Sequence, residues 1–572
     1  MIQSQISLLG ELQESVDATL DRFKQEDVVK RLWAKDASLW KDDPIHRKVI
    51  QNRLGWLKSV DWLVAEAHHL THFQKEVRKN GFSHAVLLGM GGSSLAPEVF
   101  RQTFGPISGS PRLIVLDSTD PDQILCVEKL VRLTKTLFIV STKSGTTLET
   151  LSLYRYFFEK VKAKKGANAG ENFIAITDKD SPLQKEAETL SFFRVFVNPS
   201  DVGGRFSVLS YFGMVPAATM GIPVKKLIDR MKQEVDESLP VNSSMSSGAS
   251  LGLTIGEAWK QGRDKLTIIM SPSIHSYGLW IEQLLAESLG KEGKGIVPIF
   301  GETLFGPEGY QNDRLFVYLN CGKKEQKIES KLKELQSAGH PVVRILLKDP
   351  LDLGRQFFRW SLAIAIAGIE IGVNPFDEPN VQEAKDWTKK FLDELKTHGK
   401  FLDRKPQIKG KRFDITFGVP ALKQLNVKGT PSLAGFLQLI RSGDYLNMSA
   451  YLPYDAKNEK IFQKIRMKLK SETKTATMFG FGPRYLHSTG QLHKGGPNSC
   501  VMILFTADST GDAPIPGQFF GFGQLEYAQA LGDFQALNSK GRRTVHIHLK
   551  RPIAKALFAV EKLFDHAMSQ LK

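Results

Sequence analysis

Short apolar runs that alternate with helical patterns constrain the fold of this chain more than any other feature. Continuous apolar runs occur at residues 84–90, 112–118, 136–142 and 172–178, and stretches with helical periodicity separate them. A strand that is buried on both faces is apolar throughout, and such strands belong to parallel sheets covered by helices. The pattern therefore predicts an α/β protein with parallel sheets between layers of helices.

The strand and helix pattern starts again twice, which predicts several domains in a chain of 572 residues. Strands are expected near 265–272, 295–301, 314–320 and 341–347, and a last series at 445–452, 475–482, 500–508 and 544–550. We predict N-terminal helices at 1–75, a first α/β domain at 76–240, a second at 241–400 and a C-terminal α/β extension at 401–572. Whether this extension is independent or completes the second sheet is left open.

Two local patterns support the predicted N-terminal helices and the predicted boundary between the first and second domains. Leu8, Leu9, Leu12, Val16 and Leu20 are spaced for one face of a helix. The serine-rich, nearly uncharged segment 241–250 has the composition of a linker.

Composition excludes several classes of protein. The net charge of +16 favours polyanions or phosphorylated metabolites in general as binding partners. The basic residues are scattered, however, and they form no basic stripe with interleaved aromatic residues, so no nucleic-acid partner is predicted. Three widely spaced cysteines argue against a disulfide framework and a cysteine metal site, and they fit a reducing compartment. The longest apolar run, 362–373, is short and includes Glu370, which predicts a buried helix. No membrane partner is expected, and we predict a cytoplasmic protein.

A glycine-rich turn follows the first predicted strand. The dinucleotide fingerprint G-x-G-x-x-G would need glycine at 89, 91 and 94, but Ser94 occupies the third position. Asp117, at the end of the next strand, is further along than the usual ribose-binding acid. Taken alone, this stretch is equally well explained as a tight turn between a strand and a helix.

A second loop, at 141–150, follows the strand 136–140 and is rich in hydroxyl groups. Its hydroxyls and Lys143 lie where a new helix begins, which is the composition of an anion site. The structural alternative is a capping box formed by Thr146 and Glu149. Capping needs only one hydroxyl, so we favour a monophosphate held by hydroxyls, backbone amides and one ammonium group. The two loops end adjacent strands and should face a common crevice.

Two further stretches contain charged candidates. Two glycines precede Arg205, a sequence that suits a guanidinium which must reach a ligand and stabilise an oxyanion, although a surface ion pair would also explain it. Gln283 and Glu287 are four residues apart and share a helix face. Glu287 falls in the last helical turn, where the helix dipole should raise its pKa. Such a glutamate is more often only solvated.

Taken together, these segments resemble the phosphoglucose isomerase family. Five segments occur in the family's order: 89–98, 141–150, 201–210, 283–291 and 374–385. The resemblance implies two sugar-isomerase domains and the interconversion of glucose 6-phosphate and fructose 6-phosphate. It also implies a sugar phosphate as the ligand, no cofactor, no metal, and a homodimer with sites near the subunit interface.

The same resemblance implies roles for individual residues. Glu287 matches the base that moves the proton between C2 and C1, Arg205 matches the group that stabilises the enediolate, and Lys385 matches a lysine near the ring oxygen. Gln283 matches a substrate-binding glutamine. The phosphate is expected to be held by Ser93, Thr142, Lys143, Ser144 and Thr147.

The chain departs from the family pattern in two places. In the segment 374–385, Glu378 replaces a glutamine, Asn380 a glycine and Gln382 a glutamate. No histidine follows the strand near 295–302, where the family has its ring-opening histidine. The C-terminal extension resembles the corresponding part of bacterial isomerases that are fused to transaldolase.

The extension contains a candidate for the missing histidine. Our hypothesis is that His493 opens the sugar ring, with His487 and His275 as the next candidates. The alternative is a loop with incidental histidines. His546 and His548 share one face of a predicted strand and are expected to be structural.

Two rival functions remain at this point. An NAD-dependent enzyme would use the turn at 89–94, but the missing third glycine argues against it. A non-catalytic sugar-phosphate sensor would bind the ligand without converting it, and the missing histidine favours it. The joint presence of Glu287, Gln283, Arg205 and Lys385 favours catalysis.

Overall fold

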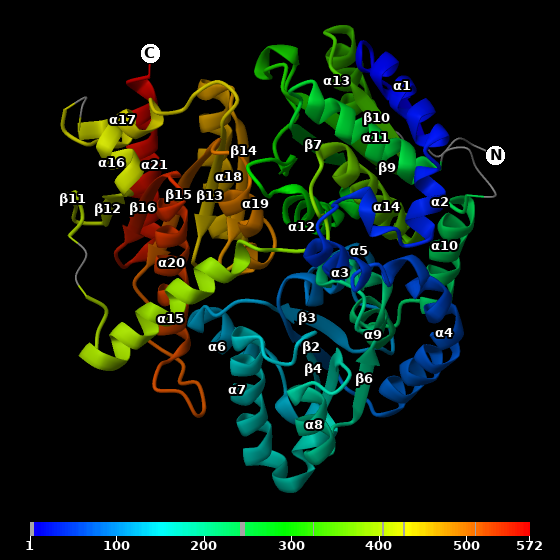
Figure 1. Ribbon diagram of the computed structural model, residues 1–572. Coiled ribbons are helices and arrows are strands. Elements are labelled where there is room, and N and C mark those ends of the chain that lie inside the picture. Colours follow the sequence, from blue (N-terminus) through cyan, green and yellow to red (C-terminus); the bar gives the residue numbers. More distant parts are fainter. Residues whose placement is uncertain are drawn as a thin grey trace.

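Three mostly parallel β-sheets, each flanked by helices, form the protein (Figure 1). The computed structural model describes residues 5–240, 246–323, 325–402, 405–426, 429–509 and 511–571. The predicted α/β class is confirmed, with two sheets in the first 350 residues and a third in the C-terminal extension.

The first sheet contains five parallel strands in the order β3-β2-β4-β5-β6. The chain moves outward from β2 in both directions, so the strand order reverses between β2 and β4, where open α/β sheets bind their ligands. The strands are β2 (His84–Gly89), β3 (Arg112–Leu116), β4 (Thr136–Ser141), β5 (Phe173–Asp178) and β6 (Arg194–Asn198). The helices that follow are α5 (Leu95–Phe104), α6 (Pro121–Leu130), α7 (Leu148–Lys165), α8 (Pro182–Thr189), α9 (Tyr211–Thr219) and α10 (Val224–Glu237).

Both faces of this sheet are buried, which explains its continuous apolar runs. Ala85 and Leu87 of β2 belong to the core shared with the N-terminal helices. Val86 and Leu88 point the other way and belong to a second core formed with α7 and with helices from later in the chain. Alternate residues of a strand face opposite sides, so two cores require an apolar residue at every position.

The second sheet has the order β1-β10-β9-β7-β8, with β1 antiparallel and the others parallel. Its strands are β1 (Gln5–Leu8), β7 (Lys265–Met270), β8 (Val297–Phe300), β9 (Arg314–Cys321) and β10 (Val342–Leu347). Its helices are α11 (Ser247–Lys260), α12 (Tyr277–Leu289), α13 (Gln326–Ser337) and α14 (Leu353–Ile371), and α14 contains most of the long apolar run in a buried helix, as expected.

The N-terminal helices begin later than predicted. Leu8 ends strand β1 and is 52% exposed, whereas α1 starts at Leu12. The edge of the second sheet offers unpaired backbone groups at β10, and pairing with them outweighs the helical spacing of these leucines. The helices are α1 (Leu12–Gln25), α2 (Val28–Trp33), α3 (Pro44–Gln51) and α4 (Trp56–Lys79).

The C-terminal extension forms a sheet of its own and does not complete the second one. Its order is β11-β12-β16-β15-β13-β14, with β13 to β16 parallel and the β11–β12 hairpin antiparallel at one edge. The strands are β11 (Ile408–Lys409), β12 (Phe413–Phe417), β13 (Tyr445–Ala450), β14 (Ala476–Phe481), β15 (Cys500–Ala507) and β16 (Arg543–Leu549). The helices are α16 (Val419–Asn426), α17 (Leu433–Leu437), α18 (Ala456–Thr473), α19 (Gly490–Gly495), α20 (Phe522–Ser539) and α21 (Ile553–Ser569).

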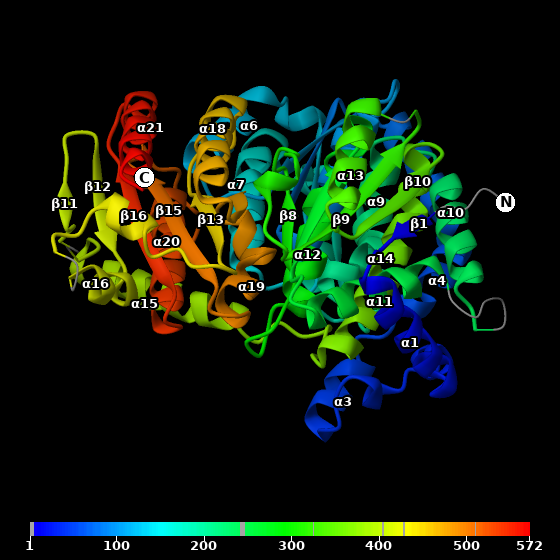
Figure 2. The same cartoon turned by 90° about the horizontal axis from the view of Figure 1, so that it is seen from above.

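The extension packs against both other sheets. Val297 and Ile299 of β8 share a core with Met478 of β14 and Tyr445 of β13, which places the second and third sheets side by side (Figure 2). Helix α15 (Val381–His398) crosses from the second sheet to α20, and both helices contribute to the core beneath α7. The three sheets, with the helices that flank them, therefore meet near the carboxyl ends of β2 and β4.

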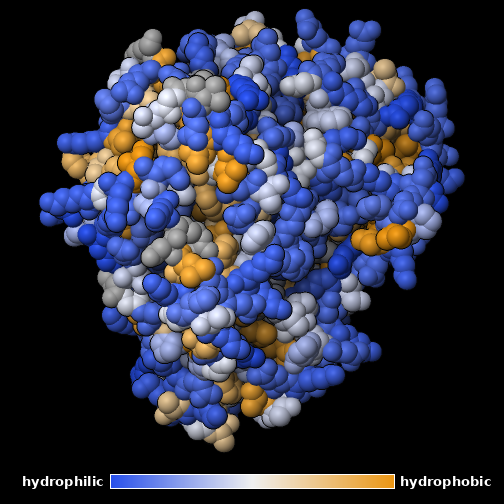
Figure 3. All heavy atoms as spheres, turned by 60° about the vertical axis from the view of Figure 1, so that its left-hand side comes forward, coloured by the Kyte–Doolittle hydropathy of each residue, from blue (hydrophilic) through white to orange (hydrophobic). Residues whose placement is uncertain are grey.

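The proposed division into four parts stays a prediction, because these cores join the parts to one another. The first half of the expected linker, 241–245, lies outside the described residues, and Ser246 caps α11. Hydrophilic residues dominate the face shown in Figure 3, with apolar residues in small patches. None of the described helices is both long and apolar enough to cross a membrane.

Candidate active site

A pocket of about 500 Å³ opens where the three sheets meet. The two loops predicted to bind phosphate line it from the ends of β2 and β4, and α12, α15 and the C-terminal extension line its other sides. The structure brings together nine of the ten predicted site residues here: Ser93, Thr142, Lys143, Ser144, Thr147, Arg205, Gln283, Glu287 and Lys385. His493 is elsewhere.

The hydroxyl-rich loop leads directly into α7. The Thr142 and Thr147 hydroxyls are 2.9 Å apart, and the Ser144 and Thr146 hydroxyls are 2.8 Å apart. Thr147 is the N-cap of α7 and makes no side-chain capping bond, so the alternative of a capping box at Thr146 is wrong. The first N–H groups of a helix attract anions when no side chain caps them, which fits the predicted phosphate site.

Lys143 is less available than the sequence suggested. Its ammonium group pairs with Asp178 at the end of β5 and donates to the Ser200 carbonyl oxygen at 2.8 Å. Arg53, in the turn between α3 and α4, lines the same pocket and supplies a second positive charge. No local pattern marks Arg53, because it lies in a different element and about 90 residues before the loop that it faces.

The glycines of the turn after β2 allow close packing of backbones. A Cβ atom on Gly92 would lie 2.0 Å from the Gly204 carbonyl oxygen, and one on Gly91 would lie 2.5 Å from the His487 carbonyl oxygen. Gly91 also has a φ of +55°, which L side chains rarely adopt. These glycines therefore let the turn after β2 approach both the Arg205 loop and the C-terminal extension.

Arg205 is held rigidly at one side of the pocket. Its Nε donates to the Ser288 hydroxyl at 2.9 Å, and its Nη2 donates to the carbonyl oxygens of Pro375 and Asp377 at 2.9 and 2.8 Å. Its Nη1 faces two carboxylates, Glu378 at 2.9 Å and Glu287 at 3.4 Å. Because three of the five contacts go to fixed neutral oxygens, the guanidinium is oriented in advance for charge that develops in the pocket.

Glu287 lies in the last turn of α12, as predicted, and its carboxylate reaches the pocket. Burial raises its pKa to about 7, the Arg205 charge opposes this rise, and the Glu378 charge adds to it. Gln283 donates to Glu287 Oε2 at 3.3 Å and to the His487 carbonyl oxygen at 2.9 Å, while its own Oε1 is buried with no partner among the described residues. A carboxylate with this pKa is suited to both accept and return a proton near neutral pH.

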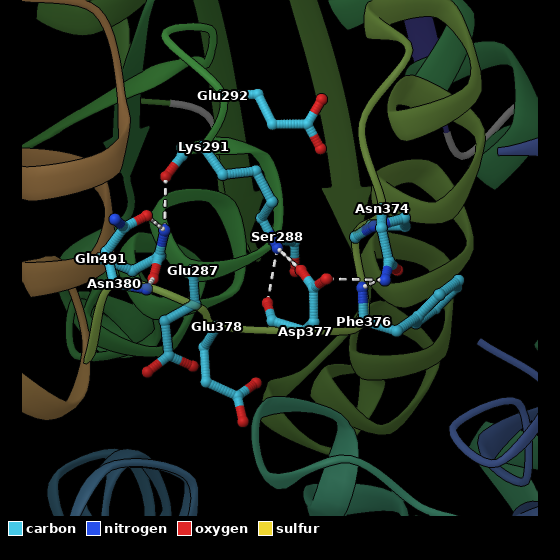
Figure 4. A network of polar contacts seen from close by, with 12 residues as sticks. Glu287, Ser288, Lys291, Glu292, Asn374, Phe376, Asp377, Glu378, Asn380 and Gln491 are labelled. Carbon is cyan, nitrogen blue, oxygen red and sulfur yellow. Dashed lines mark hydrogen bonds and ion pairs between the residues drawn. The ribbon is translucent and has the colours of Figure 1, made fainter. Parts of the chain in front are cut away.

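Glu378, which replaces the family's glutamine, is part of the site. Figure 4 shows Glu287 and Glu378 extending to the same side of the segment 374–380, away from the Lys291–Asp377 pair. Burial raises the pKa of Glu378, but the charge and hydrogen bond of Arg205, together with the charges of Arg53 and Lys291, hold the pKa below its usual value. Two carboxylates thus share one guanidinium.

The segment 374–380 is anchored on both sides. Lys291 pairs with Asp377 at 2.8 Å, and burial lowers the pKa of Lys291 to about 8. Gln491 of α19 accepts from the Asn380 backbone N–H at 2.8 Å and donates to its side-chain oxygen at 2.8 Å. The residue that departs from the family's glycine, Asn380, is therefore bonded to the C-terminal extension.

His487 of the extension lines the pocket, and a carboxylate orients it. Its Nε2 lies 2.9 Å from Glu149 Oε1, and Gln529 of α20 also donates to that oxygen at 2.7 Å. Burial would raise the pKa of Glu149, but the neighbouring His487 lowers it to about 2. A carboxylate that binds one ring nitrogen fixes the ring and leaves the other nitrogen for proton transfer.

His493 does not line the pocket. It is fully buried, with Nδ1 2.9 Å from the Tyr445 hydroxyl and Nε2 3.0 Å from the Thr489 hydroxyl. Burial lowers its pKa to about 3, so it stays neutral. His275 is exposed and lines a different pocket near Phe300. The structure therefore moves the ring-opening hypothesis from His493 to His487.

Asp117 has a role other than ribose binding. It forms a two-point ion pair with Arg484 at 2.7 and 2.8 Å and accepts from Ser94, which occupies the place of the third glycine of the fingerprint. Arg484 lies three residues before His487. The acid that a dinucleotide site would need instead holds the extension against the first sheet.

No site for a metal was found in the described part of the chain, where no group of three or more His, Cys, Asp or Glu side chains could hold an ion. The residues that sequence analysis missed are Arg53, Glu149, Glu378 as a pocket carboxylate, and Gln529. Only Glu378 had a signal, its departure from the family's motif. Arg53 lines the pocket from a distant segment, whereas Glu149 contacts His487 and Gln529 binds Glu149 without lining the pocket.

Comparison with known proteins agrees with this geometry. The family model for phosphoglucose isomerase matches residues 70–299. A probable glucose-6-phosphate isomerase from Methanococcus maripaludis is 28% identical over 414 residues, which cover 64% of this chain and 90% of the relative. A glucose-6-phosphate isomerase from a Cyanothece species is 25% identical over 440 residues, covering 70% and 81% of the two chains.

Solved structures support the fold. A hypothetical protein from Thermus thermophilus has a TM-score of 0.58 at 24% identity and covers 68% of this chain and all of its own. A glucose-6-phosphate isomerase from Chlamydia trachomatis has a TM-score of 0.53 at 19% identity, with 67% of this chain and 87% of its own covered.

Proposed function

We propose that this chain, which belongs to the phosphoglucose isomerase family over residues 70–299, interconverts glucose 6-phosphate and fructose 6-phosphate. The observation that carries the proposal is the convergence of Glu287, Arg205 and the hydroxyl-rich loop on one pocket. A phosphate held at one end would place the sugar carbons between a base and a fixed guanidinium.

The phosphate is held at the start of α7 in this proposal. The hydroxyls of Ser93, Thr142, Ser144 and Thr147 and the first N–H groups of the helix would donate to its oxygens. Lys143 and Arg53 supply positive charge, although Lys143 must share its ammonium group with Asp178.

The cyclic sugar has to open before its C2 proton becomes acidic. We assign this step to His487, which would take the proton of the O1 hydroxyl and pass a proton to the ring oxygen. Glu149 fixes the imidazole for this transfer. Lys385 lies on the exposed side of the same pocket, where its ammonium group can contact the ring oxygen.

Glu287 then removes the proton from C2 of the open-chain aldose. The negative charge moves to O1 and forms an enediolate, which Arg205 Nη1 stabilises. Protonated Glu287 returns the proton to C1, the O2 proton passes to O1, and the ketose forms. With a pKa near 7, Glu287 is partly ionised at neutral pH, so neither direction of transfer is strongly opposed.

The alternative of a non-catalytic sugar-phosphate sensor loses its main support. It rested on the missing histidine after residue 295, and His487 now lies at the pocket. The ionisable residues of the pocket are also those that the chemistry requires.

A direct assay tests the proposal. Purified protein should convert fructose 6-phosphate to glucose 6-phosphate, and Glu287→Gln should lower kcat by about 10²- to 10⁴-fold, the usual range for loss of a general base. Arg205→Lys should cost roughly 3–4 kcal/mol in transition-state stabilisation. Binding of the sugar phosphate without any turnover by the wild-type protein would refute the isomerase and favour the sensor.

We keep two further expectations as parts of the proposal. A homodimer is implied by the family, yet every residue in this mechanism belongs to one chain. Sedimentation at assay concentrations, with activity measured across a dilution series, tests whether the active form is a dimer. A cytoplasmic location is supported by three free cysteines at widely separated positions.

A further inference from the structure

A second pocket, of about 300 Å³, lies at the carboxyl ends of the strands of the C-terminal sheet. Tyr451 follows β13, Thr506 and Asp508 come from the end of β15, and His548 is on β16. The chain moves outward from β13 toward β14 on one side and toward β15 on the other, so this is the point where the strand order reverses. Open α/β sheets bind ligands at such a point. The pocket shares no lining residue with the catalytic one.

The walls of this second pocket are acidic and aromatic. Asp508, Asp512 and Glu526 contribute carboxyl groups, and the rings of Phe401 and Tyr527 lie edge to face with centroids 5.2 Å apart. Of the described residues that line it, none is lysine or arginine. The catalytic pocket, lined by two lysines and two arginines, has the opposite character. An anionic ligand is therefore disfavoured here.

Two of the three carboxylates already have partners. Asp508 Oδ1 lies 3.0 Å from His548 Nε2. The other ring nitrogen of His548 lies 2.8 Å from the Thr506 hydroxyl. Asp512 accepts from the backbone N–H groups of Gly523 and Gln524 at the start of α20, at 2.6 and 3.2 Å. These contacts hold both carboxylates in place.

Glu526 is different, because its side chain has no such partner among the residues that the structure describes. The residue is 9% exposed, and its Oε1 is buried without a hydrogen bond to any part of the chain that the structure describes. Burial raises its pKa well above the ordinary value, and the charges of Asp120, Asp122 and Asp512 add to the rise. A buried polar atom without a partner costs roughly 1–3 kcal/mol, so a donor in the pocket would relieve an unfavourable state.

We propose that this second pocket binds a small organic cation, a primary amine or a guanidinium, through Glu526, Asp508 and Asp512. The cation donates to the unpartnered Glu526 oxygen, the two fixed carboxylates supply the attracting charge, and the rings of Phe401 and Tyr527 contact its alkyl part and its charge. A metal ion fits poorly, since no group of described side chains in this region forms a metal site. A neutral polyol would leave the charge of the pocket unused.

Calorimetric titration with 1,4-diaminobutane tests the proposal, and 1,4-butanediol is the neutral probe of the same length. The amine should bind at least about 10-fold more tightly than the diol, because hydrogen bonds to charged groups are the stronger ones. Binding should also release a proton, because a cation beside Glu526 favours its ionised form. Titrations in buffers with different ionisation enthalpies measure this release in the wild-type protein alone.

A pair of matched variants locates the site. Glu526→Gln keeps the shape of the protonated acid, so it should fold, lose at least about 10-fold in affinity for the amine and release no proton. Glu282→Gln is the control, since Glu282 is also 9% exposed, also has a raised pKa of about 8, and lines a different pocket. It should leave amine binding unchanged.

Three results would overturn the proposal. These are equal binding of the diol and the amine, unchanged amine binding in Glu526→Gln, and no binding of the amine at millimolar concentrations. None of them bears on the isomerase, whose pocket is separate.

Discussion

Replacement of Glu378 by glutamine should shift the pH dependence of the enzyme toward acid. Both Glu378 and Glu287 contact Arg205 Nη1, at 2.9 and 3.4 Å, so their two oxygens are at most 6.3 Å apart. The Glu378 side chain is 44% exposed, so solvent screens the repulsion between them. With an effective dielectric constant of about 40–80, two charges at that distance interact by roughly 0.7–1.3 kcal/mol, which is about 0.5–1 pH unit.

The sign follows from the role of Glu287. As a base it must be ionised, so activity falls as the pH drops through its pKa of about 7. Loss of the neighbouring negative charge favours ionised Glu287 and lowers that pKa. In Glu378→Gln, the acid limb of the kcat/KM profile should therefore move about 0.5–1 unit lower.

The assay is the conversion of fructose 6-phosphate, coupled to detection of the product, across the pH range. Glu292→Gln is the matched control. Glu292 is 40% exposed, directly follows Lys291 (Figure 4), and pairs with Lys41 instead of Arg205. Its profile should match the wild type. An unchanged or more alkaline acid limb in Glu378→Gln would refute the contribution of the Glu378 charge to the raised Glu287 pKa.

Three other predictions test the site. His487→Gln should lower kcat on cyclic glucose 6-phosphate by about 10²-fold or more. His493→Gln, compared per folded molecule, should change kcat little. Similar losses of kcat in both variants would count against His487 as the ring-opening group. Gly92→Ala places a Cβ 2.0 Å from a carbonyl oxygen and should lower the free energy of unfolding in urea by about 1–3 kcal/mol. Gly204→Ala, whose Cβ would have no atom within 4 Å among the described residues, should leave that free energy unchanged. Equal stabilities of the two variants would contradict the packing argument. The Glu149 pKa of about 2 lies below its ordinary value of 4.5, so the ionised carboxylate stabilises the fold above pH 4.5, and this stabilisation is lost as the pH falls toward 2. Glu149→Gln should therefore lose less unfolding free energy than the wild type between pH 4.5 and pH 2. An equal loss in both proteins would argue against the His487 contact.

The sequence by itself determined the architecture and much of the pocket. Continuous apolar runs require strands buried on both faces, and Ala85 to Leu88 alternate between two cores as that requires. Parallel strands end at the same edge of a sheet, so the loops after β2 and β4 had to meet once the sheet was parallel. Local order along the chain was sufficient for these features, because the continuous apolar period is a local property and is itself typical of parallel strands.

Only the tertiary structure decided between the histidines. His487 and His493 are six residues apart in one glycine-rich segment, and no local sequence pattern separates them. The Asp117–Arg484 ion pair holds His487 at the pocket, and the Tyr445 hydroxyl holds His493 inside the extension. The choice depends on packing between elements hundreds of residues apart.

The same reason explains the other differences. Leu8 and Leu9 are spaced for a helix, but the open edge of β10, more than 330 residues away, pairs with β1. Arg53 lines the pocket from near the start of the chain, and Gln529, from near its end, donates to Glu149, the partner of His487. Periodicity and spacing report what a segment can form, and long-range contacts decide which partner it meets.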